Sequence, residues 1–81
     1  MQHGEVVAVN GRRGMFIVAI ERGDHAVFEL LSGVDIAVGD RIAGNLEGLG
    51  HEELVHLGSR VRFKAYGQSG PSSRAACQRL L

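Results

Sequence analysis

Asn10-Gly11-Arg12-Arg13-Gly14-Met15-Phe16-Ile17-Val18 is the stretch of sequence that decides the fold. An Asn-Gly pair between two apolar runs is the strongest short-range signal for a β-hairpin. A valine-rich run, Gly4–Val9, precedes the pair, and a longer apolar run, Gly14–Glu21, follows it. The sequence therefore predicts two antiparallel strands that turn at Asn10-Gly11, with Arg12 and Arg13 at the tip.

The second of these strands is apolar on both faces. One face carries Met15, Ile17 and Ala19, and the other carries Phe16, Val18 and Ile20. Side chains alternate across a strand, and a strand that is polar on neither side is buried on both. We therefore expect a central strand, or one that is covered on its outer as well as its inner face.

Further short strands are predicted along the chain at His25–Leu31, Arg41–Leu46, His51–Leu57 and Arg60–Tyr66. The third of these is ambiguous with a single helical turn, and we favour a strand. The last has the cleanest alternation, because Val61, Phe63 and Ala65 lie on one face and polar side chains on the other. Glycine-rich turns separate all of these runs, as expected for short strands.

The tail Ser72–Leu81 is compatible with two structures. Pro71 followed by two serines can begin a helix that places Ala76 and Leu80 on one side. Alternatively, Ala75, Cys77, Arg79 and Leu81 alternate as in a closing strand. The sequence leaves this choice open.

Length and composition indicate one small globular domain, residues 1–81. The chain has 44% hydrophobic and 22% charged residues, which excludes a disordered class. Its longest uncharged apolar run, Met15–Ile20, is far too short to span a bilayer. A single cysteine, Cys77, rules out an internal disulfide and fits a reducing compartment, so we expect a cytoplasmic protein.

The formal net charge is zero, with nine basic and nine acidic residues. This balance argues against a protein that depends wholly on nonspecific attraction to phosphates, although it allows a local basic stripe. The stripe is found in Arg60, Arg62, Lys64 and Tyr66, which share one face of the predicted strand. Three cations could follow a phosphate backbone while the tyrosine stacks on a base. The alternative is a solvated face whose charges prevent pairing with other chains.

The chain resembles the OB-fold superfamily, and within it two groups of small β-barrels. Similarity to S1-like RNA-binding domains lies in the strand starts Gly4–Val7, Gly14–Val18 and Val38–Ile42. Similarity to cold-shock domains lies in Arg13–Ile17, Ala26–Glu29, Gly58–Phe63 and Ser69–Pro71. The resemblance implies binding of single-stranded nucleic acid, with Phe16 and Phe28 as stacking groups. Glu29 stands where the cold-shock pattern has a histidine or an aromatic residue.

Other candidate sites have simpler explanations. Arg12 and Arg13 could add phosphate contacts, or they could be solvated turn residues. Phe16 and Phe28 could stack on bases, but a chain with three Phe, one Tyr and no Trp needs aromatics in its core. We expect at least one of the two inside, and Cys77 as a small buried hydrophobe.

Metal and catalytic sites are not predicted. The four histidines have no recognised ligand spacing, and His51 and His56 would point to opposite faces of a strand. Phosphate-loop, dinucleotide and nucleophile-elbow motifs do not occur. We therefore expect neither an enzyme nor a cofactor.

The sequence thus predicts an all-β, OB-fold-like small barrel of five to six short antiparallel strands, with a short C-terminal helix as one option. The predicted function is weak binding of single-stranded RNA or DNA, with RNA favoured. The alternative is a protein-interaction or self-association module, in which an unpaired edge strand or the apolar second face of Gly14–Ile20 docks a partner or forms a homodimer.

Overall fold

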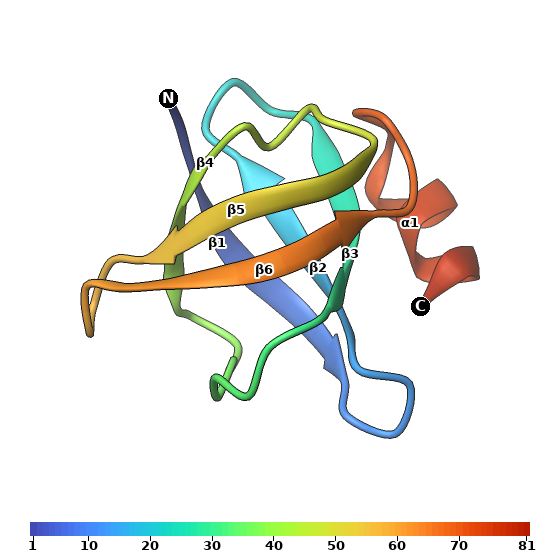
Figure 1. Ribbon diagram of the computed structural model, residues 1–81. Helices are drawn as coiled ribbons and strands as arrows, with labels where there is room; N and C mark the ends of the chain where they lie inside the picture. Colours follow the sequence, from blue (N-terminus) through green and yellow to red (C-terminus); the bar gives the residue numbers. More distant parts are fainter.

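The computed structural model describes residues 1–81 as a closed barrel of six strands and one short helix (Figure 1). The elements are β1 (Gln2–Asn10), β2 (Met15–Ile20), β3 (His25–Leu30), β4 (Arg41–Gly44), β5 (Gly50–His56), β6 (Val61–Gly67) and α1 (Arg74–Leu80). The predicted small all-β barrel is confirmed, including β5, for which a helical turn was the alternative. The tail is a helix, which settles the choice that the sequence left open.

The barrel consists of two three-stranded meanders that close on each other. Around the barrel the strands follow the order β1-β2-β3-β6-β5-β4, and every neighbouring pair is antiparallel. β1 pairs with β4 at one seam, and β3 pairs with β6 at the other. Because each meander needs only local turns, the glycine-rich loops are sufficient to build both.

The first hairpin turns where the sequence predicts, through four residues between Asn10 and Met15. Asn10 Oδ1 accepts hydrogen bonds from the backbone N–H groups of Arg12 (3.2 Å) and Arg13 (3.3 Å), which fixes the turn. Gly14 has a φ of 67°, a left-handed conformation that glycine adopts without strain. It therefore completes the turn, and the second strand begins one residue later than predicted.

The barrel interior is apolar and contains three phenylalanines. Phe16 stacks on Phe28, with ring centroids 5.8 Å apart, and Phe63 lies 6.3 Å from Phe16 at a tilt. Aliphatic side chains from β1, β4 and β5 complete this core. Offset and tilted aromatic pairs of this kind add to the stabilisation that burial alone provides.

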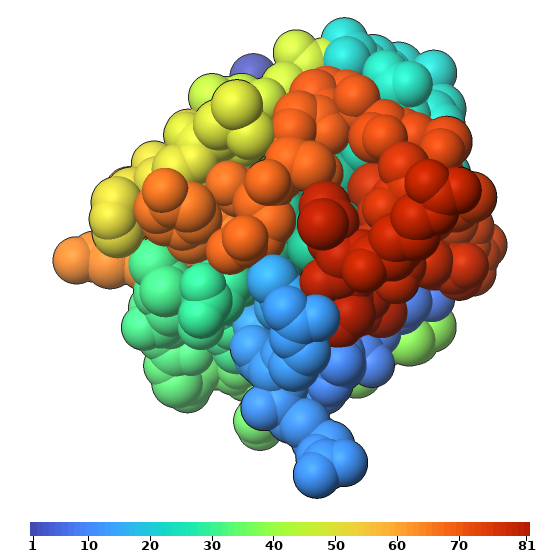
Figure 2. Space-filling model, turned by 90° about the vertical axis from the view of Figure 1, so that its right-hand side faces the viewer, coloured from blue at the N-terminus to red at the C-terminus, as the bar shows by residue number.

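A second apolar cluster lies outside the barrel wall, under α1. Met15, Ile17 and Val27 point outward from β2 and β3 and pack with Cys77 of the helix. Figure 2 shows α1, in red, lying against the first hairpin, in blue. The prediction that both faces of the second strand are covered is confirmed, and so is the burial of Cys77.

This packing corrects the expectation about partner docking. The apolar second face of Gly14–Ile20 cannot dock a partner as proposed, because α1 already covers it. The helix contacts the barrel through Cys77, whereas Leu80 is 42% exposed. Ala76, which the sequence places on the same side of the helix as Leu80, is partly buried.

Candidate nucleic-acid interface

β6 places the predicted basic residues on its outer face. Phe63 and Ala65 point into the barrel, and Arg62, Lys64 and Tyr66 alternate with them and point outward. Arg60 differs from the prediction, because it lies in the turn before β6 with a φ of 59°. The face is therefore a row of two cations and one aromatic on the strand, with a third cation at the hairpin tip.

The neighbouring strand β5 contributes acidic and aromatic groups to the same surface. Register pairs His51 with Tyr66, Glu53 with Lys64, and Val55 with Arg62. Glu53 Oε1 also lies 3.5 Å from Arg62 Nη1, and both side chains are more than half exposed. A pair this exposed contributes little to stability, but it lowers the positive potential of the surface. The basic row is thus partly neutralised by its neighbour.

Tyr66 is flanked on both sides by polar residues. The ring of His51 meets it edge to face, with centroids 5.1 Å apart and an interplanar angle of 86°. On its other side Tyr66 pairs with Glu29 of β3, whose Oε1 accepts a hydrogen bond from Gln68 Nε2 at 3.3 Å. Tyr66 remains 38% exposed and is the one aromatic ring among Phe and Tyr that reaches the surface.

His51 was missed as a member of this site. Its position follows from the β5–β6 register, in which His51 and Tyr66 face each other. The alternation of both strands together with the length of their connecting turn would have predicted the pair. Each strand considered alone contains no such signal.

The expectation that Phe16 and Phe28 stack on bases is wrong. They are 1% and 0% exposed, respectively, and they stack on each other inside the barrel. Both point inward because the outward positions of β2 and β3 are filled by Met15, Ile17 and Val27 under α1. The resemblance to cold-shock domains therefore does not extend to a pair of surface phenylalanines.

Arg12 and Arg13 do not join the basic row, and they differ from each other. Arg13 Nη1 donates to the backbone carbonyls of Leu80 (3.2 Å) and Leu81 (3.1 Å), at the C-terminal end of α1. A cation here satisfies helix carbonyls that have no partner within the helix. Arg12 makes no such side-chain contact and is exposed. One tip arginine is thus structural, and the other is solvated.

His56 forms a hydrogen-bonded chain at the far end of β5. Its Nε2 lies 2.8 Å from Asp40 Oδ2, and its Nδ1 accepts from the N–H of Ser59 at 3.2 Å. Because Nδ1 is an acceptor here, the proton of the neutral ring is placed on Nε2, facing the carboxylate. The pKa of Asp40 is lowered, first by the N–H of Ala37 and then by His56. The chain ties the β5–β6 turn to the loop before β4.

Other chemical groups do not gather into a centre. No set of three or more His, Cys, Asp or Glu side chains is positioned to hold a metal ion. Burial raises the pKa of the Cys77 thiol, with an opposing contribution from the Ser69 hydroxyl. The only helix, α1, has seven residues, too few to cross a membrane.

Comparison with known proteins gives no relative for this chain. Searches of family models, curated proteins and solved structures return no match. Membership of the OB-fold superfamily therefore stays a prediction from the sequence.

Proposed function

We propose that the outer face of β6 binds single-stranded nucleic acid, with RNA favoured over DNA, without catalysis. The observation that carries the proposal is the outward row of Arg62, Lys64 and Tyr66 on one strand. Alternate residues are roughly 6.6 Å apart along a strand, so that an extended polynucleotide can contact several of them in turn. The mechanism is electrostatic attraction of the backbone, together with stacking of one base on Tyr66.

The surface favours weak binding. Only one stacking ring is exposed, and Glu53 and Glu29 lie beside the row. Stacking contributes about 1–3 kcal/mol per base, so a single ring supplies only a small part of a tight affinity. We also propose a cytoplasmic location, because a reducing compartment keeps the single free thiol of Cys77 reduced.

The test is a titration of fluorescent oligo-U and oligo-dT at low and moderate salt, followed by anisotropy. The Arg62→Ala/Lys64→Ala variant should lose most of the binding, and Tyr66→Ala should weaken it by about tenfold, equivalent to 1.4 kcal/mol. Arg74→Ala/Arg79→Ala removes the same charge from α1, outside this face, and is the matched control. Equal loss in both double variants would mean that only net charge matters, and would contradict the proposed site.

A further inference from the structure

Strand β5 of the closed barrel is paired along the whole of one edge but along only part of the other. β6 pairs with β5 along its whole length, from Gly50↔Gly67 to His56↔Val61. On the other side, β4 pairs with β5 only at Ile42↔His56 and Ala43↔Val55. The segment Gly50–Leu54 therefore has a neighbouring strand on one side alone. Figure 1 shows the short β4 beside the longer β5.

The register identifies the backbone groups along this edge that lack partners. Leu57 N–H donates to Arg41 O at 2.9 Å, so Leu57 points its backbone groups toward β4. In an antiparallel strand every second residue points the same way, which directs Val55, Glu53 and His51 to the same edge. β4 meets Val55 and then ends at Gly44. The N–H and C=O groups of Glu53 and His51 consequently have no partner strand.

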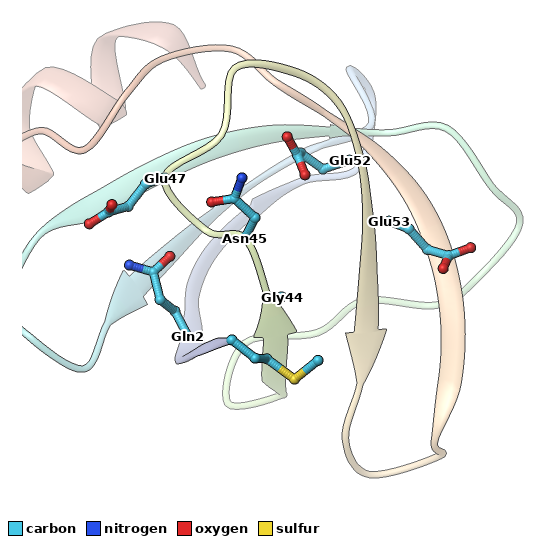
Figure 3. Close-up of a pocket in the computed structure, with 7 residues that line it drawn as sticks. Gln2, Gly44, Asn45, Glu47, Glu52 and Glu53 are labelled. Atoms are coloured by element: carbon cyan, nitrogen blue, oxygen red, sulfur yellow. The ribbon is translucent and has the colours of Figure 1, made fainter.

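Glu53 lines a surface groove of about 440 Å³, together with its neighbour Glu52 and the end of β4. Figure 3 shows the groove between β5 and the end of β4, with Gly44 and Asn45 on one side and Glu52 and Glu53 on the other. Gly44 has a φ of 146°, and the chain leaves the β5 edge just after it. The groove therefore lies where a longer β4 would have continued.

The charge of the groove defines the chemistry of its occupant. Glu47, Glu52 and Glu53 line it, and no lysine or arginine does. Glu47 is ion-paired with Arg22 and Glu53 is near Arg62, whereas Glu52 has no ion-pair partner. Carboxylates repel phosphates, and a row of unpaired backbone groups is a template for another polypeptide strand.

We propose that an extended, lysine- or arginine-rich segment of a partner protein adds as a strand to the Gly50–Leu54 edge of β5. Main-chain hydrogen bonds to His51 and Glu53 hold the segment, and its cations face Glu52 and Glu47. The edge site uses the backbone groups of His51 and Glu53, whereas the β6 face uses the side chains of Arg62, Lys64 and Tyr66, so each site can fail without the other. Pairing at the half-open edge of β5 takes the place of the fully unpaired edge strand that was predicted from the sequence.

The probe is a fluorescein-labelled peptide of alternating lysine and valine, acetylated and amidated at its ends. We expect one-to-one binding by anisotropy, and at least tenfold weaker binding for a version whose backbone nitrogens are methylated at alternate residues. A peptide with glutamate in place of lysine should not bind. In amide hydrogen exchange, the N–H groups of His51 and Glu53 should become protected when the peptide is added.

Two variants with matched charge separate the groove from general electrostatics. Glu47→Gln/Glu52→Gln should weaken peptide binding about tenfold or more, whereas Glu5→Gln/Asp35→Asn, exposed elsewhere, should leave it unchanged. Equal binding of the methylated peptide, or equal effects of the two variants, would overturn the proposal. So would a stable dimer by light scattering that protects the same two amides, because a second copy would then occupy the edge. Peptide binding that survives Arg62→Ala/Lys64→Ala supports two independent sites.

Discussion

At the scale of single residues, Gly4 shows how closely the barrel strands pack. A Cβ atom added there would lie 2.5 Å from Val18 Cγ1 and 2.7 Å from the backbone oxygen of Ala19. Because one of these atoms belongs to the backbone of the paired strand, a rotamer change cannot relieve the contact. We expect Gly4→Ala to lower the free energy of unfolding by about 1–3 kcal/mol in urea titrations. Gly11→Ala is the control, since a Cβ there meets nothing within 4 Å.

Asp40 gives the protein a dependence of stability on acidic pH. Its pKa is lowered in the folded state because its carboxylate accepts hydrogen bonds from Ala37 N–H and from His56. Because the pKa of Asp40 is lower in the folded protein than in the unfolded chain, its carboxylate stabilises the folded state. This contribution to the free energy of unfolding is complete above the unfolded pKa of about 3.9, and it is lost as pH falls through the pKa of the folded state.

Asp40→Asn tests this linkage. We expect the variant to be about 1 kcal/mol less stable than the parent near pH 7, because charge-assisted hydrogen bonds become neutral ones. The difference should shrink as pH falls below about 4, where the unfolded parent is protonated first, and should be lost once pH passes below the lowered pKa of the folded carboxylate. Urea unfolding of parent and variant at a series of pH values measures this difference in the free energy of unfolding. A difference that stayed constant with pH would show that the charge of Asp40 is unimportant.

At the scale of elements, the first hairpin and α1 stabilise each other. Arg13 donates to the carbonyls of Leu80 and Leu81, and Asn10 Nδ2 donates to Leu81 O at 2.8 Å. Cys77 is the buried residue of α1 itself, so the rate at which a thiol reagent labels it reports how often α1 leaves the barrel.

We expect Arg13→Ala to accelerate the labelling of Cys77 by about threefold to tenfold, as hydrogen bonds of this type contribute about 0.5–1.5 kcal/mol. Arg12→Ala is the matched control from the same turn and should leave the rate unchanged. Neither substitution should resemble Arg62→Ala/Lys64→Ala in oligonucleotide binding. A loss of binding with Arg13→Ala but no faster labelling would indicate that this arginine belongs to the interface.

The sequence predicts elements well where local signals are strong. Asn10-Gly11 predicts the hairpin, and the alternation of Val61, Phe63 and Ala65 predicts the two faces of β6. The role of Phe16 could not be predicted in this way. Its strand, β2, is apolar on both faces, and only the docking of α1 decides which face is the barrel interior, where Phe16 meets Phe28. Tertiary contacts made by distant residues are invisible to a local pattern.

At the scale of the whole molecule, barrel closure determines where function can reside. Closure occupies most strand edges, and α1 covers the outer wall of β2 and β3. The outer wall of β5 and β6 and the half-open edge of β5 are among the surfaces that stay uncovered. The cations of β6 predict the first surface, the outer wall of β5 and β6, from the sequence. The half-open edge of β5 depends on where β4 ends relative to β5, and no residue pattern in either strand specifies that point.

The charge arrangement of the whole molecule determines how binding responds to salt. Three cations, Arg60, Arg62 and Lys64, lie on or beside the β6 face of a chain whose formal net charge is zero. For single strands the logarithm of affinity falls with the logarithm of salt at a slope near 0.7 per neutralised phosphate, which gives a slope of about −2 here. Glu53→Gln should raise affinity at low salt about twofold to fivefold, because it frees Arg62 and removes a nearby negative charge. Anisotropy titrations at several salt concentrations measure both quantities. A slope near zero would mean that phosphates are not contacted, and a slope steeper than about −4 would require cations from outside this face, such as Arg12.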